Sequence, residues 1–395
     1  MRKIESFTHL HLHSSFASIQ DAVGKPIAYC EKAANIGQTA LAVSEHGSCA
    51  SHFAFHQAGK ETDTHIIYGN EFYFAADRTL RGFTDEEKNG LTATEIRDAN
   101  KARLRKAHLL LIAETDEGLH NIYRLNYHAN TSGFYGKPTI DLPLLRQYSK
   151  GIIATTTCVI SPMARMLQNK KIDDMSIWFE DMLTIFGKDR FFIELHPHDL
   201  DIQREYNQVL IEMFRKKYDV KTLICNDVHY VDESHHEIHN FLWRLNTDGK
   251  FDEAGIDKLH FATEEEMIQK WFAAGMGDII GDEYLYEGIE NTKTIANRCN
   301  ARLDVDTIKE PQFDVPSGYK GNKEYILHLL KSGMESKVRN NLILEKDVSK
   351  YVDRLKDELE LISDKGYLDY FLITNDFTQW AYENDILMSP GRGSA

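Results

Sequence analysis

Short apolar segments alternate with amphipathic segments along the first 230 residues of the chain. Runs rich in Ile, Leu, Val and Ala predict buried strands, and the segments between them, such as residues 25–35 and 50–60, show the spacing of apolar residues typical of helices. Strands are expected at residues 7–14, 39–44, 65–68, 107–113, 151–156, 190–195 and 221–226. Six or seven strand–helix units predict an α/β domain with a parallel sheet.

Polar residues recur where these strands end. They are His46, Glu71, Cys158, Asp227 and His229. In a closed parallel barrel the carboxyl ends of all strands meet at one mouth, whereas an open sheet would gather only some of these side chains. No Gly-x-Gly-x-x-Gly motif follows the first strand, which weighs against a dinucleotide-binding fold. We therefore expect a barrel over residues 1–275, with residues 84–106 as a charged, solvated insertion.

The pattern changes after about residue 275. Seventeen of the 18 histidines lie at or before His260, so imidazole chemistry is confined to the first region. Beyond it we expect a helix at residues 290–298, an extended linker at 311–316, charged amphipathic helices over 323–364 and a helix through Trp380. Residues 276–395 are thus predicted to form a second, mostly helical region.

Composition narrows the class of protein. The formal net charge of −15 argues against a generally basic surface that grips nucleic acid, but it suits a site that concentrates divalent cations. Five widely spaced cysteines without a Cys-x-x-Cys pair argue against a disulfide framework and a Cys-type zinc finger. No long apolar run and no signal-peptide pattern occur, so we expect a cytoplasmic protein without membrane contact.

The segment Phe-Thr-His-Leu-His-Leu-His-Ser at residues 7–14 is the most informative part of the sequence. In a strand, His9, His11 and His13 would share one face, which is a set of potential metal ligands. The alternative is a histidine-rich surface strand. Because Leu10 and Leu12 make the other face apolar, a buried strand is favoured, and buried imidazoles need partners.

Collecting potential ligands along the chain adds imidazoles, carboxylates and one thiol. The set is His11, His13, Asp21, His46, Glu71, His108, Cys158, Asp227 and His229. This mixture suits Zn²⁺, Mn²⁺ or Fe²⁺ better than Ca²⁺ or Mg²⁺, and two or three such ions are typical of phosphate-ester hydrolysis. Taken singly, His108, Glu71 and Cys158 could be core residues and Asp21 a helix cap. His196 and His198 remain ambiguous.

All nine positions, in this order, resemble the ligand signature of the polymerase and histidinol phosphatase (PHP) domain family. The resemblance implies a distorted (β/α)7-type barrel that holds three metal ions. Within the family the chain is most similar to the N-terminal part of bacterial or phage DNA polymerase III alpha subunits, through residues 133–138, 226–230, 370–373 and 390–394. One departure is Glu45, where the family usually has Asp.

The second resemblance implies that residues 276–395 are the incomplete start of a polymerase palm. In the family, the segment Gly391, Arg392, Gly393 and Ser394 binds the triphosphate of the incoming nucleotide. The residues agree with that role, since two glycines let backbone N–H groups approach an anion and Arg392 and Ser394 add donors. The catalytic palm aspartates would lie beyond residue 395, so we expect no polymerisation by this chain alone.

Together these features predict a metal-dependent 3′–5′ exonuclease that proofreads DNA. Asp227, His13 and His108 are the expected catalytic residues, with two or three divalent ions, Zn²⁺ or Mn²⁺ and alternatively Mg²⁺ or Fe²⁺. The expected partners are the primer 3′ end and a C-terminal polymerase fragment or other replisome subunits. The alternatives are a structural interaction module completed by a second polypeptide, and a free-standing PHP phosphatase.

Overall fold

The computed structural model describes residues 3–249, 256, 258–305, 307, 310–389 and 391. The chain divides into two compact units, Met1–Leu303 and Asp304–Ala395. Helix α13 (Glu283–Arg298) begins earlier than expected and packs on strand β8 (Thr222–Ile224), which places it in the first unit. The first unit therefore continues past residue 275, where the sequence suggests the boundary.

The first unit is built on a curled mixed sheet. Its further strands are β1 (Ala40–Val43), β2 (His65–Phe74), β3 (Ala107–Ala113), β4 (Phe134–Tyr135), β5 (Lys137–Ile140), β6 (Ile152–Thr155) and β7 (Phe191–Leu195). The order is β4-β5-β2-β3-β6-β7-β8, and β1 pairs with β2. The expectation of an all-parallel sheet is wrong, because β3 runs antiparallel to both β2 and β6. The segment between β2 and β3 returns the chain to the same end of the sheet, which reverses the direction of β3.

Residues 9–13 connect strand β1 with the segment that follows β8. The backbone N–H groups of Ala42 and Ser44 donate to His9 O and Leu12 O at 2.8 and 2.9 Å. On the other side, His13 N donates to Val228 O at 2.8 Å, and Val228 N donates to His11 O at 3.0 Å. The expected regular strand at residues 7–14 is thus an extended segment with one β-bridge, Leu12 to Val228. Its hydrogen bonds close a distorted α/β barrel, which confirms the predicted fold class.

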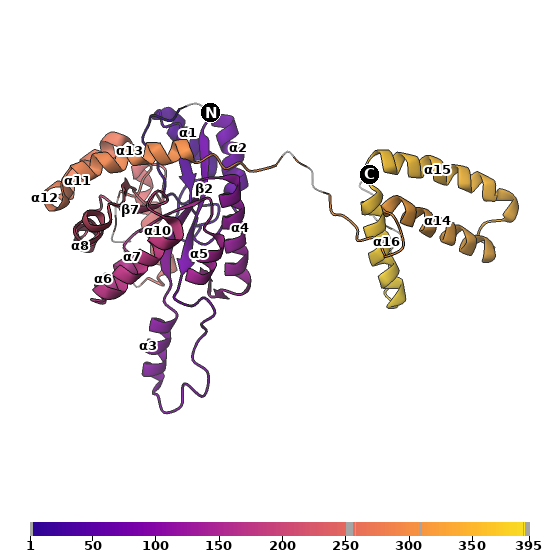
Figure 1. Ribbon diagram of the computed structural model, residues 1–395, viewed down its shortest axis with the longest axis horizontal. Coiled ribbons are helices and arrows are strands. Elements are labelled where there is room, and N and C mark those ends of the chain that lie inside the picture. The colour runs from indigo at the N-terminus through magenta and orange to yellow at the C-terminus, as the bar shows by residue number, and fades with distance from the viewer. Residues whose placement is uncertain are drawn as a thin grey trace. The chain divides into compact units, whose positions relative to one another are not determined.

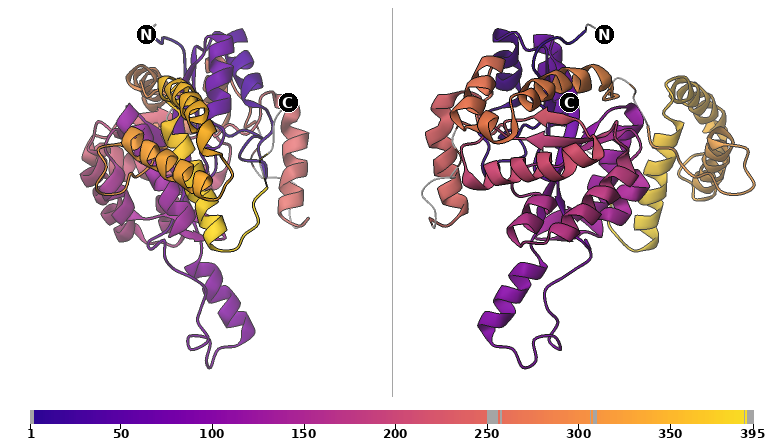
Figure 2. Two further views of the ribbon diagram at one scale, coloured as in Figure 1. Left: turned by 90° about the vertical axis from the view of Figure 1, so that its right-hand side faces the viewer. Right: turned by 60° about the vertical axis from the view of Figure 1, so that its left-hand side comes forward.

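Helices surround the outside of the sheet (Figures 1 and 2). In the first unit they are α1 (Pro26–Asn35), α2 (His52–Thr62), α3 (Ala93–Arg103), α4 (Asp116–Thr131), α5 (Leu142–Tyr148), α6 (Pro162–Gln168), α7 (Ile172–Phe186), α8 (Asp201–Val209), α9 (Lys216–Tyr218), α10 (His236–Asn246), α11 (Glu264–Ala273), α12 (Met276–Ile280) and α13. Helix α3 lies on the expected charged insertion, which projects away from the sheet (Figure 1). The insertion therefore has helical structure of its own.

The start of α4 shows how closely a helix approaches the sheet. Thr115 caps the helix by accepting a hydrogen bond from Gly118 N at 3.2 Å. A Cβ atom at Gly118 would lie 1.8 Å from Gly151 O, immediately before β6. Only glycine fits there without displacing backbone, so this contact fixes α4 against the barrel.

The second unit is helical, as expected. It contains α14 (Asn322–Arg339), α15 (Val348–Asp364) and α16 (Leu368–Glu383). Its buried apolar cluster is small and consists of Ile326, Leu368 and Leu372. Among the residues described here, no helix in either unit is long and apolar enough to cross a membrane. Of the expected triphosphate-binding segment, Gly391 is described, with a φ of 113°, whereas Arg392, Gly393 and Ser394 lie outside the described residues.

Candidate metal centre

Glu71, on β2, is the buried centre of a ligand cluster in the barrel. Its Oε1 lies 3.0 Å from His108 Nδ1 and 3.2 Å from His11 Nε2. Its Oε2 lies 2.6 Å from His46 Nδ1, and the Cys158 thiol is 3.8 Å from Oε1. One carboxylate thus touches potential ligands that come from four other segments of the chain.

Asp227, which follows β8, forms the second half of the cluster. Its Oδ1 lies 3.2 Å from His13 Nε2, 3.4 Å from His11 Nε2 and 3.6 Å from His229 Nδ1. The backbone of Asp227 has a φ of 54°, a left-handed conformation that costs a non-glycine residue on the order of 1 kcal/mol. The conformation lets Asp227 and His229 face the same three-residue segment, His11 to His13.

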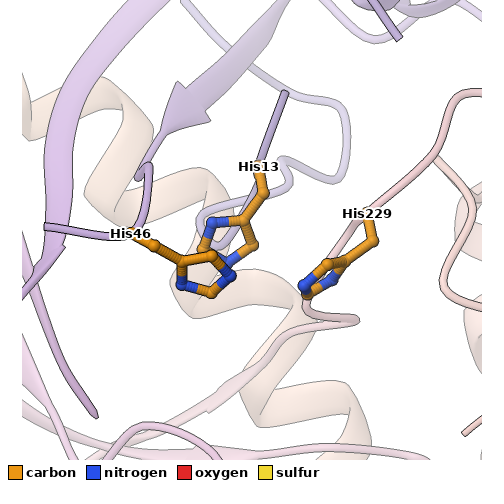
Figure 3. Close-up of side chains that lie close together, drawn as sticks. All are labelled: His13, His46 and His229. Atoms are coloured by element: carbon orange, nitrogen blue, oxygen red, sulfur yellow. The ribbon is translucent and has the colours of Figure 1, made fainter. Parts of the chain in front are cut away.

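The imidazoles of His13, His46 and His229 converge from three separate parts of the chain (Figure 3). Each offers a nitrogen within 4.8 Å of a nitrogen on the other two. Asp21 joins them, since its Oδ2 lies 3.3 Å from His46 Nε2. The structure therefore brings all nine ligand candidates of the sequence analysis into one cluster.

The cluster is completed by Glu194 and His196, which the sequence analysis did not select as ligands. Glu194, buried on β7, places Oε1 2.8 Å from His11 Nδ1 and 2.7 Å from His196 Nε2. Its other oxygen accepts a hydrogen bond from Thr155 Oγ1. The signal for Glu194 was a single acid inside the apolar strand Phe-Phe-Ile-Glu-Leu. Because it holds the nitrogen of His11 that faces away from Glu71 and Asp227, Glu194 fixes the orientation of that ring.

Other histidines near the cluster do not join it. His9 Nε2 donates a hydrogen bond to Ala262 O at 2.9 Å, so the expected shared face of His9, His11 and His13 holds only for the last two. His198 contacts Asn226 O at 3.1 Å. Both are buried outside the ligand cluster, and Nδ1 of His9 has no hydrogen-bond partner among the described residues.

Glu45 lies next to the cluster and is linked to it through two serines. Its two carboxylate oxygens accept hydrogen bonds from Ser14 Oγ and Ser18 Oγ, and Ser18 Oγ also accepts from His46 N at 3.1 Å. Glu45 is fully buried and binds no ligand candidate directly. Glu45 has a longer side chain than the Asp that is usual at this position in the PHP family. Its carboxylate is accommodated by hydrogen bonds to two serines of the neighbouring loop.

Charges in the cluster are strongly coupled. Burial alone would lower the pKa of His11, but the carboxylates of Asp227 and Glu194 raise it well above its ordinary value. Burial would likewise raise the pKa of Glu71, and His108 and His46 instead hold it well below the ordinary range. These carboxylates are thus ionised, and their charge is balanced by protons on imidazoles.

The same arrangement fits metal ions. Nε2 of His11 and Nε2 of His46 are buried and face carboxylate oxygens at 3.2 and 3.3 Å without good hydrogen-bond geometry, and Oδ1 of Asp21 is buried without a partner among the residues described. The described residues form four groups of three ligands with the spacing of a metal site; they are His13–His46–His229, His11–His13–Asp227, His11–Glu194–His196 and His46–Glu71–His108. A divalent ion would replace the imidazole protons as the balancing charge, since imidazole coordinates in its neutral form.

Comparison with known families divides the chain in the same way. Residues 9–198 match the PHP domain model, and residues 324–395 match the model described as the bacterial DNA polymerase III alpha NTPase domain. The first match begins at the histidine-rich segment and includes seven of the nine clustered ligand candidates. The last two, Asp227 and His229, follow it in the same compact unit.

Full-length relatives extend these matches. DNA polymerase III subunit alpha of Aquifex aeolicus is 32% identical over 406 residues, which cover 99% of this chain. The same subunit of Saccharopolyspora erythraea is 30% identical and also covers 99% of the chain. The chain spans about a third of the length of these relatives, 33% and 32%. Among solved structures, one described as a metal-dependent phosphoesterase from Bifidobacterium adolescentis covers 68% of this chain and 98% of its own, at 12% identity and a TM-score of 0.33.

Proposed function

Residues 9–198 belong to the PHP domain family and residues 324–395 to the bacterial DNA polymerase III alpha family, and from this premise we propose that the buried cluster is a metal-dependent phosphoesterase site acting on DNA. The observation that carries the proposal is the carboxylate of Glu71 in contact with ligand candidates from four other segments. The reaction proposed is 3′–5′ exonucleolytic cleavage of a primer end.

Glu71 and the imidazoles around it would hold two or three divalent ions, with Zn²⁺ and Mn²⁺ as the leading candidates and Mg²⁺ or Fe²⁺ as alternatives. Bound ions of this kind activate water for attack and stabilise the charge on the leaving oxygen. Among the two central carboxylates, Glu71 has no exposed side-chain surface, whereas 14% of Asp227 is exposed. Glu71 is therefore suited to holding ligands, and Asp227 to orienting water and substrate.

The two histidines proposed for catalysis, His108 and His13, differ in solvent exposure. His108 is 15% exposed and 3.0 Å from Glu71, so it reaches the opening of the cluster and can transfer a proton at the leaving oxygen. His13 has no exposed side-chain surface. Its part in catalysis is to hold Asp227 Oδ1, 3.2 Å from its Nε2.

The test replaces Asp227 by Asn, which keeps the side-chain shape and removes the charge. We expect degradation of 3′-labelled single-stranded DNA, assayed with Mn²⁺ or Zn²⁺, to fall by about 100-fold or more, with little change in the melting temperature. Asp98→Asn is the matched control, because Asp98 is exposed on α3. Equal activity in Asp227→Asn and in the unsubstituted chain would place hydrolysis at another site.

Choice of substrate separates exonuclease from phosphatase. An exonuclease should release nucleotides progressively from labelled 3′ ends. A circular single-stranded DNA, which has no 3′ end, should resist cleavage. Hydrolysis of mononucleotides without hydrolysis of DNA would favour a small-molecule phosphatase.

A second function, as an interaction module of a polymerase, is favoured by the surface of α16. Tyr370, Phe377 and Trp380 are 51–60% exposed on this helix, although they are large and apolar. We propose that further polymerase sequence covers them, as a C-terminal fragment or another replisome subunit. Tyr370→Ser with Trp380→Ser should weaken co-purification with the C-terminal two thirds of a relative, and unchanged co-purification would exclude this surface.

A further inference from the structure

Four basic residues gather beside the metal centre without an acidic partner. They are Arg105, Lys106, Lys137 and Arg165. Within the described part of the chain, none of them forms an ion pair, although other basic side chains of the barrel do, such as Arg78 with Asp141 at 2.9 Å. Two of the four stand out by burial, since Lys106 and Arg165 each have a buried nitrogen without a hydrogen bond among the described residues.

Lys106 lies immediately before β3, two residues ahead of His108. Alternation along an extended chain places the two side chains on the same face of the strand. Lys106 Nζ is buried and makes no hydrogen bond among the described residues. The charge of Asp77 acts on Lys106, but the two side chains form no ion pair among the described residues, and Asp77 Oδ1 accepts hydrogen bonds from Thr79 N at 2.8 Å and from Thr79 Oγ1 at 2.6 Å.

Arg165 approaches the same edge from α6, which packs on β3. The loop that leads to α6 contains Cys158 and is joined to β3 by a hydrogen bond from His108 N to Ile160 O at 3.3 Å. Arg165 Nε is buried without a hydrogen bond among the described residues. Burial, with the nearby charge of Arg105, lowers the pKa of Arg165 to about 10.

Lys137 extends the group along the other side of His108. Its ammonium lies 3.1 Å from the Tyr73 hydroxyl and 4.9 Å from the centre of the Tyr73 ring. That ring is 5.4 Å from the His108 ring and 6.5 Å from the His46 ring. Tyr73 thus holds Lys137 beside two of the ligand candidates.

Keeping the partly buried cations Lys106 and Arg165 without an ion-pair partner is costly unless an anion joins them, whereas Arg105 and Lys137 are exposed. We propose that Lys106 and Arg165, flanked by Arg105 and Lys137, bind successive backbone phosphates of the single DNA strand whose 3′ end enters the metal centre. This inference deepens the proposed function and rests on it for the identity of the strand. The four residues would act as positioning residues, since they lie outside the ligand cluster.

The experiment measures binding separately from hydrolysis. A fluorescent single-stranded oligonucleotide is titrated with the full chain in Ca²⁺ at several salt concentrations, and the Lys106→Gln/Arg165→Gln double variant is compared with it. Loss of two phosphate contacts should reduce the slope of log Kd against log salt by about 1.4, because each contact to a single strand contributes about 0.7. Lys150→Gln/Arg97→Gln removes two exposed cations, one on the barrel and one on the insertion, and should leave the slope unchanged.

Kinetics give a second readout. For oligonucleotide hydrolysis the double variant should raise KM at least tenfold with little change in kcat, while cleavage of the p-nitrophenyl ester of thymidine 5′-monophosphate, which has one phosphodiester and no backbone, stays the same. Lys106→Arg/Arg165→Lys keeps both charges and should restore binding, which separates lost charge from misfolding. A salt slope equal to that of the unsubstituted chain overturns the inference. Absence of hydrolysis in the unsubstituted chain would instead refute the proposed function and leave the binding result standing.

Discussion

The two units of the chain differ in which side chains they bury and which they expose. The first unit buries carboxylates and imidazoles, such as Glu71 and His11, in the middle of an extensive apolar core. The second unit has a small apolar cluster around Ile326 and leaves large side chains such as Trp380, 58% exposed, in solvent. Burying charged groups is costly, and so is exposing aromatic surface to water. The first unit has the first of these costs and the second unit has the second.

Each unit would be stabilised by a different kind of ligand. In the first unit imidazole protons balance the buried carboxylates, and the proposed metal ions would supply this positive charge in their place. The exposed face of α16 lacks apolar cover, which the proposed polymerase partner would supply. We therefore expect the two units to respond differently to metals, acid and side-chain volume, and the following experiments test that difference.

Metal removal should have the largest effect. Ions that bind only the folded state at a thousand times their Kd stabilise it by about 4 kcal/mol each. Chelation should therefore lower the unfolding temperature of the first unit strongly and leave the second unit unaffected. Calorimetry, with hydrogen exchange to assign each transition, measures this. A shift of both transitions, or of neither, would contradict the difference between the units.

Adding one methyl group at Gly118 should be nearly as damaging. The Cβ of alanine would meet Gly151 O at 1.8 Å, which forces α4 away from the sheet. We expect Gly118→Ala to reduce the free energy of unfolding of the first unit by about 3 kcal/mol or more. Urea denaturation monitors the loss, and Gly333→Ala, at a helical glycine with open space beside it, controls for replacing glycine by alanine within a helix. A Gly118→Ala variant as stable as the unsubstituted chain would show that α4 can shift at little cost.

Acid should destabilise the first unit in part through His52. Burial, opposed by a hydrogen bond to Gly69 O, lowers the pKa of His52 to about 4, below the value of about 6.5 in an unfolded chain. Between these values only the unfolded state takes up the proton, so stability falls as the pH drops from about 6.5 to 4, by at most about 1.4 kcal/mol for each pH unit. His52→Gln should flatten the pH dependence of unfolding by one proton. An unchanged slope would mean that His52 is protonated in the folded state.

The smallest expected effect has the opposite sign and lies in the second unit. Gly333, inside α14, has no atom within 4 Å of the position of an added Cβ. Gly333→Ala should therefore stabilise the second unit by about 0.5–1 kcal/mol through a higher helix propensity. Thermal unfolding followed by hydrogen exchange gives the value. Destabilisation would show that the helix surface at Gly333 is covered in solution.

The sequence predicted the ligand cluster better than the sheet. Strand ends and His-x-His spacing are local features, and they led to His13, Asp227 and the other candidates that the barrel brings together. The direction of β3 depends on which end of the sheet the insertion returns to, and no local pattern encodes that. Glu194 was missed because a single acid in an apolar strand has the same local signature whether it faces a ligand or a counter-charge. The roles of the clustered residues remain predictions.

The backbone bonds that close the barrel set an order of events during synthesis. His11 and His13 are held by Val228, more than 200 residues later in the chain. At a translation rate of 5–20 residues per second, roughly 10 to 45 s separate the emergence of these segments from the ribosome. The nascent histidine segment can therefore pair with Ala42 and Ser44 early, but it lacks Val228 during this interval, and the ligand cluster is complete only after Asp227 and His229 have been made.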